Sequence, residues 1–218
     1  MLEIHRRLAR IALQVGEPYG FVLAGGYALS QNGIGDRPSA DVDFFTLARD
    51  TTAFAEAVIR VREALTEDNF IVTENRMGPT FADLRITDPV TGEFSDMQMG
   101  VNYREYPPAR VDIGLVLDIR DAVAGKMSAL WSRGEVRDFI DIDAVIQSGR
   151  FTREEVLVIG DSQEALPMDR IMLADRFRMV ASEPEWRFER YEVTPEMRQG
   201  IIQRFMDWAD QIDPRNLR

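Results

Sequence analysis

The 218-residue sequence contains no cysteine, so disulfide bonds and thiolate metal sites are excluded. It contains a single histidine, His5, which argues against a multi-histidine metal site and against a conventional Ser-His-Asp triad. His5 falls in an N-terminal segment with the spacing of an amphipathic helix, where we expect it to be a surface or packing residue.

Long apolar runs are also missing. No stretch approaches the roughly 20 residues that cross a bilayer, and the first residues, MLEIHRRLARIAL, are amphipathic rather than a signal sequence. We therefore expect a soluble, cytoplasmic protein with no membrane partner. The formal net charge of −11 argues against binding nucleic acid through bulk charge, although it leaves room for a local basic groove.

The order of the predicted elements indicates an α+β fold, mixed α/β to about residue 115 and all-helical after it. We expect a first domain over residues 1–115 and a second over residues 116–218. Thr51 and Thr52 are candidate caps for one helix, and Thr152 opens another with a capping box. Helices are expected over 2–15, 51–65, 118–133, 136–146, 168–180 and 194–212, and from 152. Strands are expected over 19–24, 41–45, 70–74, 80–87 and 93–101, the last two joined as a hairpin by the turn at 88–92.

The segment from Phe21 to Ala24 is a short apolar run typical of a buried strand, and Gly25-Gly26 interrupts it before a helix-compatible stretch. Glycines at such a turn let a phosphate approach the backbone. Taken alone, a glycine pair after a strand is more often only a turn.

About fifteen residues after the glycines comes Asp41-Val42-Asp43 within an otherwise apolar segment. On a strand, residues two apart point to the same face, so the two carboxylates would converge. Oxygen ligands of this kind suit Mg²⁺, which binds through one or two carboxylates and the phosphates of a substrate. The alternative is a solvated strand edge.

The glycine turn followed by the carboxylate pair resembles the motif of the nucleotidyltransferase superfamily that includes DNA polymerase β. Gly25, Gly26, Asp41 and Asp43 match that motif. Members of the superfamily often carry a third carboxylate near the metal on a later strand, and Asp96 is the best candidate. Asp83 is a weaker competitor, and a solvent-facing aspartate is the alternative.

Lys126 is the only lysine among 26 lysines and arginines. A lysine offers a compact charge that fits among crowded phosphate oxygens, and a chance surface lysine is the alternative. Because residues 41–100 are strongly acidic, we expect any basic groups for phosphates to come from residues 101–150. The pattern around Lys126 resembles the AbiEii/AbiGii-type nucleotidyltransferases, the family that supplies toxins of AbiE and MenAT toxin–antitoxin systems. The matching positions are Asp121, Lys126, Ala129, Leu130, Arg133, Arg137, Asp138 and Asp141.

This resemblance, which covers roughly residues 20–150, implies a polymerase β-like nucleotidyltransferase core with a metal site and a helical lobe that contributes to an active-site cleft. Asp41 and Asp43 would hold Mg²⁺ or Mn²⁺, and Gly25, Gly26 and Ser39 would line the triphosphate. Lys126 would contact the phosphates, and Asp138 would be the functional aspartate of the helical lobe.

In MenAT-type toxins the position of Ser39 carries Ser or Thr, where phosphorylation can silence the enzyme; a turn hydroxyl is the alternative. The resemblance implies a toxin that adds nucleotides from a nucleoside triphosphate to the 3′ end of tRNA and has a cognate antitoxin. Transfer to a small molecule or a protein hydroxyl, and a non-catalytic nucleotide-binding protein, remain alternatives.

Overall fold

The computed structural model describes residues 1–216 and divides into two compact units, Met1–Ala122 and the chain from Val123 onward. The division falls inside a helix, later in the chain than the boundary expected after residue 115. Among the described residues, no helix combines the length and the apolar character that crossing a membrane requires.

The first unit is built on a seven-stranded mixed sheet in the order β3-β4-β5-β2-β1-β7-β6. The pairs β2–β5 and β1–β7 are parallel, and the other pairs are antiparallel. The strands are β1 (Val22–Leu23), β2 (Asp41–Thr46), β3 (Ile71–Gly78), β4 (Phe81–Thr87), β5 (Phe94–Val101), β6 (Ala109–Val111) and β7 (Gly114–Val116). The helices are α1 (Glu3–Gly16), the 3-10 turn η1 (Glu17–Tyr19), α2 (Gly25–Gln31) and α3 (Thr51–Glu67).

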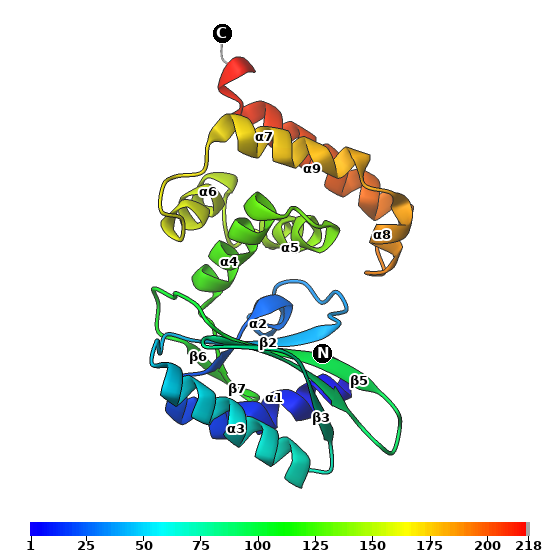
Figure 1. Ribbon diagram of the computed structural model, residues 1–218. Helices are drawn as coiled ribbons and strands as arrows, with labels where there is room; N and C mark the ends of the chain where they lie inside the picture. The colour runs from blue at the N-terminus through cyan, green and yellow to red at the C-terminus, as the bar shows by residue number, and fades with distance from the viewer. Residues whose placement is uncertain (217–218) are drawn as a thin grey trace. The chain divides into compact units, whose positions relative to one another are not determined.

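Alternating burial along the central strands explains how this sheet packs. Val42 and Phe44 of β2 are buried, whereas their neighbours on the strand are partly exposed. The same alternation runs through β4 and β5. The apolar side faces α1 and α3, which lie together on one side of the sheet (Figure 1). The hydrophobic core of the first unit therefore lies on that side, and the other side of β3, β4, β5 and β2 carries the more polar residues.

The predicted hairpin of β4 and β5 is confirmed, and its turn is closed by the Gly92 amide donating to the Asp88 carbonyl at 2.9 Å. The predicted cap of α3 was wrong. Asp50 caps the helix, since its Oδ1 accepts from the Thr52 amide at 2.8 Å and the Ala53 amide at 3.3 Å. A carboxylate one residue earlier satisfies the free amides of the first turn better than either threonine. The hairpin of β6 and β7 was not predicted, because its strands are only three residues long.

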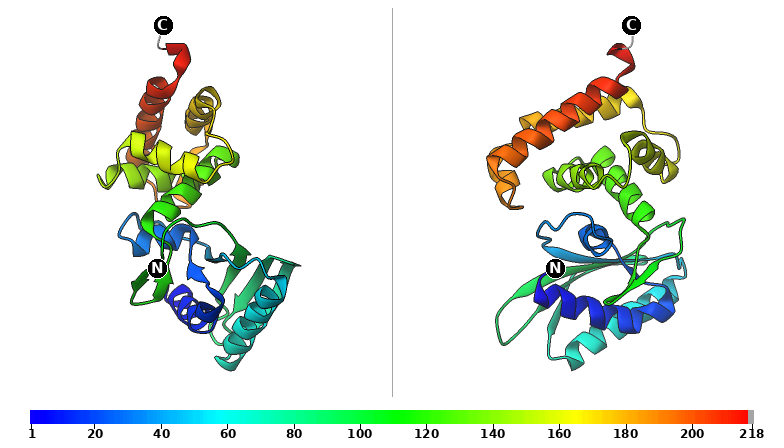
Figure 2. Two further views of the ribbon diagram at one scale, coloured as in Figure 1. Left: turned by 90° about the vertical axis from the view of Figure 1, so that its left-hand side faces the viewer. Right: turned by 180° about the vertical axis from the view of Figure 1, so that it is seen from behind.

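The second unit is helical, as predicted. Its helices are α4 (Ile119–Ser132, which begins in the first unit), α5 (Val136–Gln147), α6 (Arg153–Ser162), α7 (Arg170–Arg178), η2 (Met179–Ser182), α8 (Glu185–Glu189), α9 (Pro195–Ile212) and η3 (Pro214–Asn216). Helices α7 and α9 lie side by side (Figure 2). They are joined by aromatic packing, in which the Phe177 ring lies 5.2 Å from that of Phe205 and 4.7 Å from that of Trp208.

The capping box predicted at the start of α6 is also confirmed. The Thr152 hydroxyl accepts from the Glu155 amide at 3.2 Å, and the Glu155 carboxylate accepts from the Thr152 amide at 2.7 Å. These bonds satisfy two amides that would otherwise lack partners, and so they set where the helix begins.

Candidate active site

The glycine turn between β1 and α2 is locked against the carboxylate strand β2. Gly25 has φ of +61°, and a Cβ atom there would lie 1.8 Å from Oδ2 of Asp43. No other residue fits that position, because it would clash with the carboxylate and adopt a strained backbone. The Ala24 amide also donates to the Asp43 carbonyl at 2.8 Å. The glycine turn and Asp43 are therefore held in fixed contact.

Asp41 and Asp43 lie on the same face of β2, as their spacing predicts. Both are partly exposed, while Val42 between them and Phe44 after them are buried on the other face. Two carboxylates beside a tight glycine turn provide hard oxygen donors. This donor set fits Mg²⁺ or Mn²⁺ bound together with a polyphosphate.

Ser39 joins this cluster. Its side chain is 7% exposed, and its hydroxyl donates to Oδ1 of Asp41 at 3.0 Å. A Cβ atom on Gly26 would lie 3.5 Å from the same hydroxyl oxygen. The structure thus brings Gly25, Gly26 and Ser39 together with both aspartates, and the serine orients the first carboxylate.

Arg37 is a residue of this cluster that the sequence analysis missed. A Cβ atom on Gly26 would lie 3.2 Å from Nη2 of Arg37, and Nη1 donates to the Pro38 carbonyl at 3.0 Å. The guanidinium therefore lies against the glycine turn. It lies outside residues 101–150, where basic groups for phosphates were expected. No local pattern in the sequence marks it, because its contact with Gly26 arises only on folding.

Asp96 lies next to Asp41 in the parallel pairing of β5 with β2. Its carboxylate, however, is held by Arg85, whose Nε and Nη2 donate at 2.9 and 3.1 Å, and by the Asn75 amide at 3.1 Å. The bond to Arg85 is the main reason that the pKa of Asp96 is lowered. Within residues 1–216, no three histidine, aspartate or glutamate side chains gather as a metal site. Metal binding by Asp96 stays a prediction, and the competitor Asp83 accepts from Asn75 at 3.1 Å.

His5, the only histidine in the sequence, packs beside this cluster. Of the two roles expected for it, surface or packing, the structure shows the packing role. His5 is 2% exposed, and its Nδ1 lies 2.5 Å from the hydroxyl of Tyr27, the residue after the glycine pair. Burial lowers the pKa of His5 and the charge of Asp41 opposes that shift, while burial raises the pKa of Tyr27. The pair ties α1 to the helix that follows the turn.

Three charged motif residues of the second unit, Lys126, Asp138 and Asp141, are buried and paired. Lys126 is 8% exposed, and its Nζ lies 2.8 Å from Oδ2 of Asp141. Asp121, at the end of the first unit, accepts the amides of Glu105 and Tyr106 at 2.8 and 3.0 Å. In this motif Lys126 and Asp141 form an ion pair, and Asp121 holds the backbone of the loop at Glu105 and Tyr106.

Asp138 is fully buried at the start of α5. Nε and Nη2 of Arg133 donate to its two oxygens, each at 2.9 Å, and the Glu135 amide donates to Oδ2 at 3.1 Å. These contacts cap the helix and join it to the end of α4. They describe a structural role, and the functional role expected for Asp138 stays a prediction.

The chain is similar to known proteins over most of its length. A family model described as "Nucleotidyl transferase AbiEii toxin, Type IV TA system" matches residues 6–210. Among curated proteins, none matches the chain significantly.

Two solved structures share the fold, each at 16% sequence identity. MenT4, a nucleotidyltransferase toxin from Mycobacterium tuberculosis, has a TM-score of 0.62 over 98% of this chain and 85% of its own. A putative nucleotidyltransferase from H. pylori has a TM-score of 0.56 over 100% of this chain and 98% of its own. The predicted fold class is thereby confirmed.

Proposed function

The chain belongs to the AbiEii nucleotidyltransferase toxin family, and from that premise we propose that it transfers a nucleotide from a nucleoside triphosphate to the 3′ end of tRNA in a Mg²⁺-dependent reaction. The observation that carries the proposal is the cluster of Gly25, Asp41 and Asp43, in which a carboxylate oxygen occupies the space that a side chain on the glycine would need. Such a site places metal ligands directly against a turn open to phosphate.

In the proposed reaction the 3′ hydroxyl of the acceptor attacks the α-phosphorus, the bond to the bridging oxygen breaks, and diphosphate leaves. Asp41 and Asp43 would hold the cation, which when bound offsets the negative charge on the phosphates. The Ser39 hydroxyl keeps the Asp41 carboxylate oriented. Arg37, beside Gly26, would bind phosphate oxygens from the same turn.

We propose that Lys126 and Asp138 of the second unit serve the same reaction, Lys126 by contacting phosphates. As the family is one of type IV toxin–antitoxin systems, the proposal extends to a toxin that acts in the cytoplasm, where tRNA and nucleoside triphosphates are found, and that has a cognate antitoxin.

The test is incubation of the purified protein with total tRNA, Mg²⁺ and each α-labelled nucleoside triphosphate in turn. The variants are Asp41→Asn and Lys126→Ala, with Glu67→Gln as a control at an exposed carboxylate of α3, on the other side of the sheet. We expect label in tRNA with the wild type and the control, none with Asp41→Asn, and none after chelation of the metal. Nucleotide binding without label in RNA would contradict the tRNA acceptor and direct the search to protein or small-molecule hydroxyls.

A further inference from the structure

We propose that His5 and Tyr27 are positioning residues for the nucleoside triphosphate, because the imidazole of His5 holds the tyrosine that follows the glycine turn. This inference rests on the proposed function, in which the triphosphate lies at Gly25 and Gly26. Tyr27 comes directly after these glycines, and its hydroxyl lies 2.5 Å from Nδ1 of His5. The pair therefore joins α1 to the turn where phosphates would bind.

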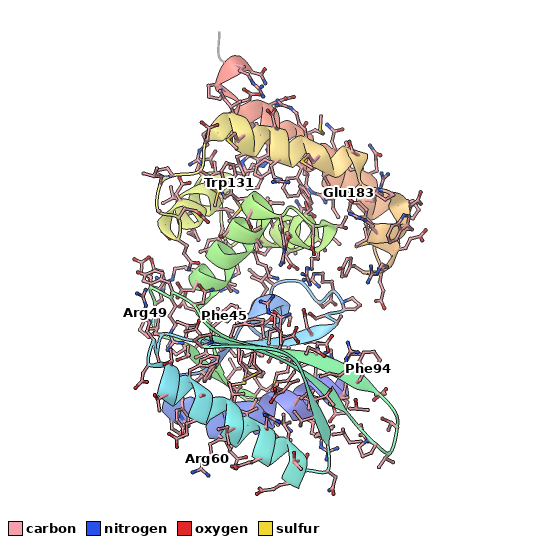
Figure 3. All side chains as sticks on the ribbon, in the orientation of Figure 1. Phe45, Arg49, Arg60, Phe94, Trp131 and Glu183 are labelled. Atoms are coloured by element: carbon pink, nitrogen blue, oxygen red, sulfur yellow. The ribbon has the colours of Figure 1, made fainter. Side chains whose placement is uncertain are left out.

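The pair is a polar contact inside an otherwise apolar layer. His5 is 2% exposed and lies on the buried face of α1 with Leu8 and Ala12, and Tyr27 is 5% exposed. Figure 3 shows side chains filling the layer between the sheet and the helices α1 and α3. The two rings meet edge to face, with centroids 5.4 Å apart. Because a buried polar group is costly without its hydrogen bond, the pair favours one orientation of Tyr27.

The direction of the hydrogen bond follows from a third group. Burial raises the pKa of the Tyr27 hydroxyl, and a hydrogen bond from the backbone of Leu2 lowers it. A bond that lowers this pKa stabilises the ionised oxygen, so the Leu2 amide is the donor. The hydroxyl hydrogen is then left for Nδ1 of His5. Nδ1 accepts it as part of a neutral imidazole that carries its own hydrogen on Nε2.

The charges around the pair favour this neutral form. Burial lowers the pKa of His5, the charge of Asp41 raises it, and the amino group of Met1 lowers it, with a lowered pKa as the result. Asp41 and Arg37 act on the pKa of Tyr27 in opposite directions. Since Asp41 and Arg37 also belong to the candidate site, the pair lies within electrostatic reach of that site.

The glycine turn needs to be held at both ends. Gly25 adopts a left-handed conformation, and a Gly-Gly sequence has the greatest backbone freedom of any residue pair. Before the turn, the Ala24 amide donates to the Asp43 carbonyl at 2.8 Å. After the turn, Tyr27 is held through its hydroxyl. Fixing both ends before the ligand arrives reduces the entropy that binding would cost, so loss of the hydrogen bond should weaken triphosphate binding.

The experiment uses the whole chain and measures the dissociation constant of each nucleoside triphosphate with Mg²⁺ by calorimetry. The triphosphate that binds most tightly is then compared across the variants. His5→Asn keeps an acceptor near the position of Nδ1, His5→Leu lacks one, and Tyr27→Phe removes the donor. Leu13→Ala is the matched control, because it opens a cavity on the buried face of α1 about 12 Å along the helix from His5.

We expect His5→Leu and Tyr27→Phe to raise the dissociation constant about fivefold, which corresponds to the loss of one neutral hydrogen bond. His5→Asn should stay within about twofold of the wild type, because its amide oxygen accepts from the tyrosine. Leu13→Ala should lower the melting temperature and still leave the dissociation constant within about twofold of the wild type.

A ¹⁵N-labelled histidine gives an NMR signal from His5 alone, because the sequence contains one histidine. We expect Nδ1 without a hydrogen and Nε2 with one, and a change in both signals when triphosphate and Mg²⁺ bind. A hydrogen on Nδ1, unchanged binding in His5→Leu and Tyr27→Phe, or equal weakening in Leu13→Ala would each overturn the inference while the proposed function stood. If the wild type bound no nucleoside triphosphate, the proposed function and the inference would both fail.

Discussion

In the first unit the motif aspartates Asp41 and Asp43 are partly exposed on an open sheet face, whereas in the second unit Lys126 and Asp138 are buried in ion pairs. The first pair lies where a substrate can reach it. The second pair helps to hold α4 and α5 together. A substitution that removes activity therefore has a different meaning in each unit, because loss of a buried partner also weakens the fold.

The largest expected effect is that of Asp41→Asn, which tests the catalytic side of the comparison. We expect the rate of nucleotide transfer to fall about a thousandfold, because the carboxylate that we propose as a metal ligand loses its charge. The free energy of unfolding should change by less than about 0.5 kcal/mol, since the side chain is partly exposed. Labelled transfer and urea unfolding measure the two quantities. If the free energy of unfolding fell by several kcal/mol, Asp41 would be a structural residue like Asp138, and the contrast between exposed and buried motif residues would be wrong.

Arg133→Met tests the structural side. It removes both side-chain hydrogen bonds to the fully buried Asp138 and keeps the one from the Glu135 amide, so we expect the free energy of unfolding to fall by about 3 kcal/mol. Arg187→Met is the matched control, because its ion pair with Glu183, which lies just before α8, is partly exposed to solvent and is worth at most about 1 kcal/mol. Equal effects of the two substitutions in urea unfolding would show that Asp138 is not stabilised as the structure indicates.

A double variant separates the two possible roles of Lys126. Lys126→Met alone removes the ammonium partner of the buried Asp141 and should lower the free energy of unfolding by about 2 kcal/mol. Adding Asp141→Leu should restore most of that stability, since replacing a buried ion pair by apolar residues is often neutral. Transfer activity should stay low in both variants if the lysine contacts phosphate. Recovery of activity together with stability would leave Lys126 a purely structural residue.

The smallest expected effect concerns the buried His5. Burial lowers its pKa in the folded state below the ordinary value of 6.5, so the unfolded chain binds protons more readily. The contribution of neutral His5 to the free energy of unfolding is fully present above the unfolded pKa of about 6.5. It is lost as the pH falls below that value toward the lower pKa of the folded state. His5→Gln should therefore reduce the decline in unfolding free energy between pH 7.5 and 5.5. Identical declines in the two proteins would show that the histidine is not held neutral.

Local patterns in the sequence were enough for several features. The spacing of Asp41 and Asp43 placed both carboxylates on one face because side chains alternate along any strand. The turn at 88–92 and the capping box at Thr152 depend on bonds between residues a few positions apart, and both are present. The family pattern followed from residue types at set intervals, and the family model matches the same region.

Features that depend on distant residues were out of reach of such patterns. Asp96 looked like a candidate ligand, but its partners Arg85 and Asn75 come from two other strands. Arg37 gained significance only when folding placed it against Gly26. The cap of α3 was misassigned for a local reason, since three consecutive residues were all acceptable caps and only the backbone geometry selects Asp50.

The sequence by itself determined the fold class, the family and the presence of a glycine turn with two aspartates, because these depend on periodicity and on residue types at fixed spacing. Only the tertiary structure decided which charged residues are exposed and which are neutralised. An ion pair offsets a charge, and the partners of Asp96 and Lys126 are set by strand pairing and helix packing.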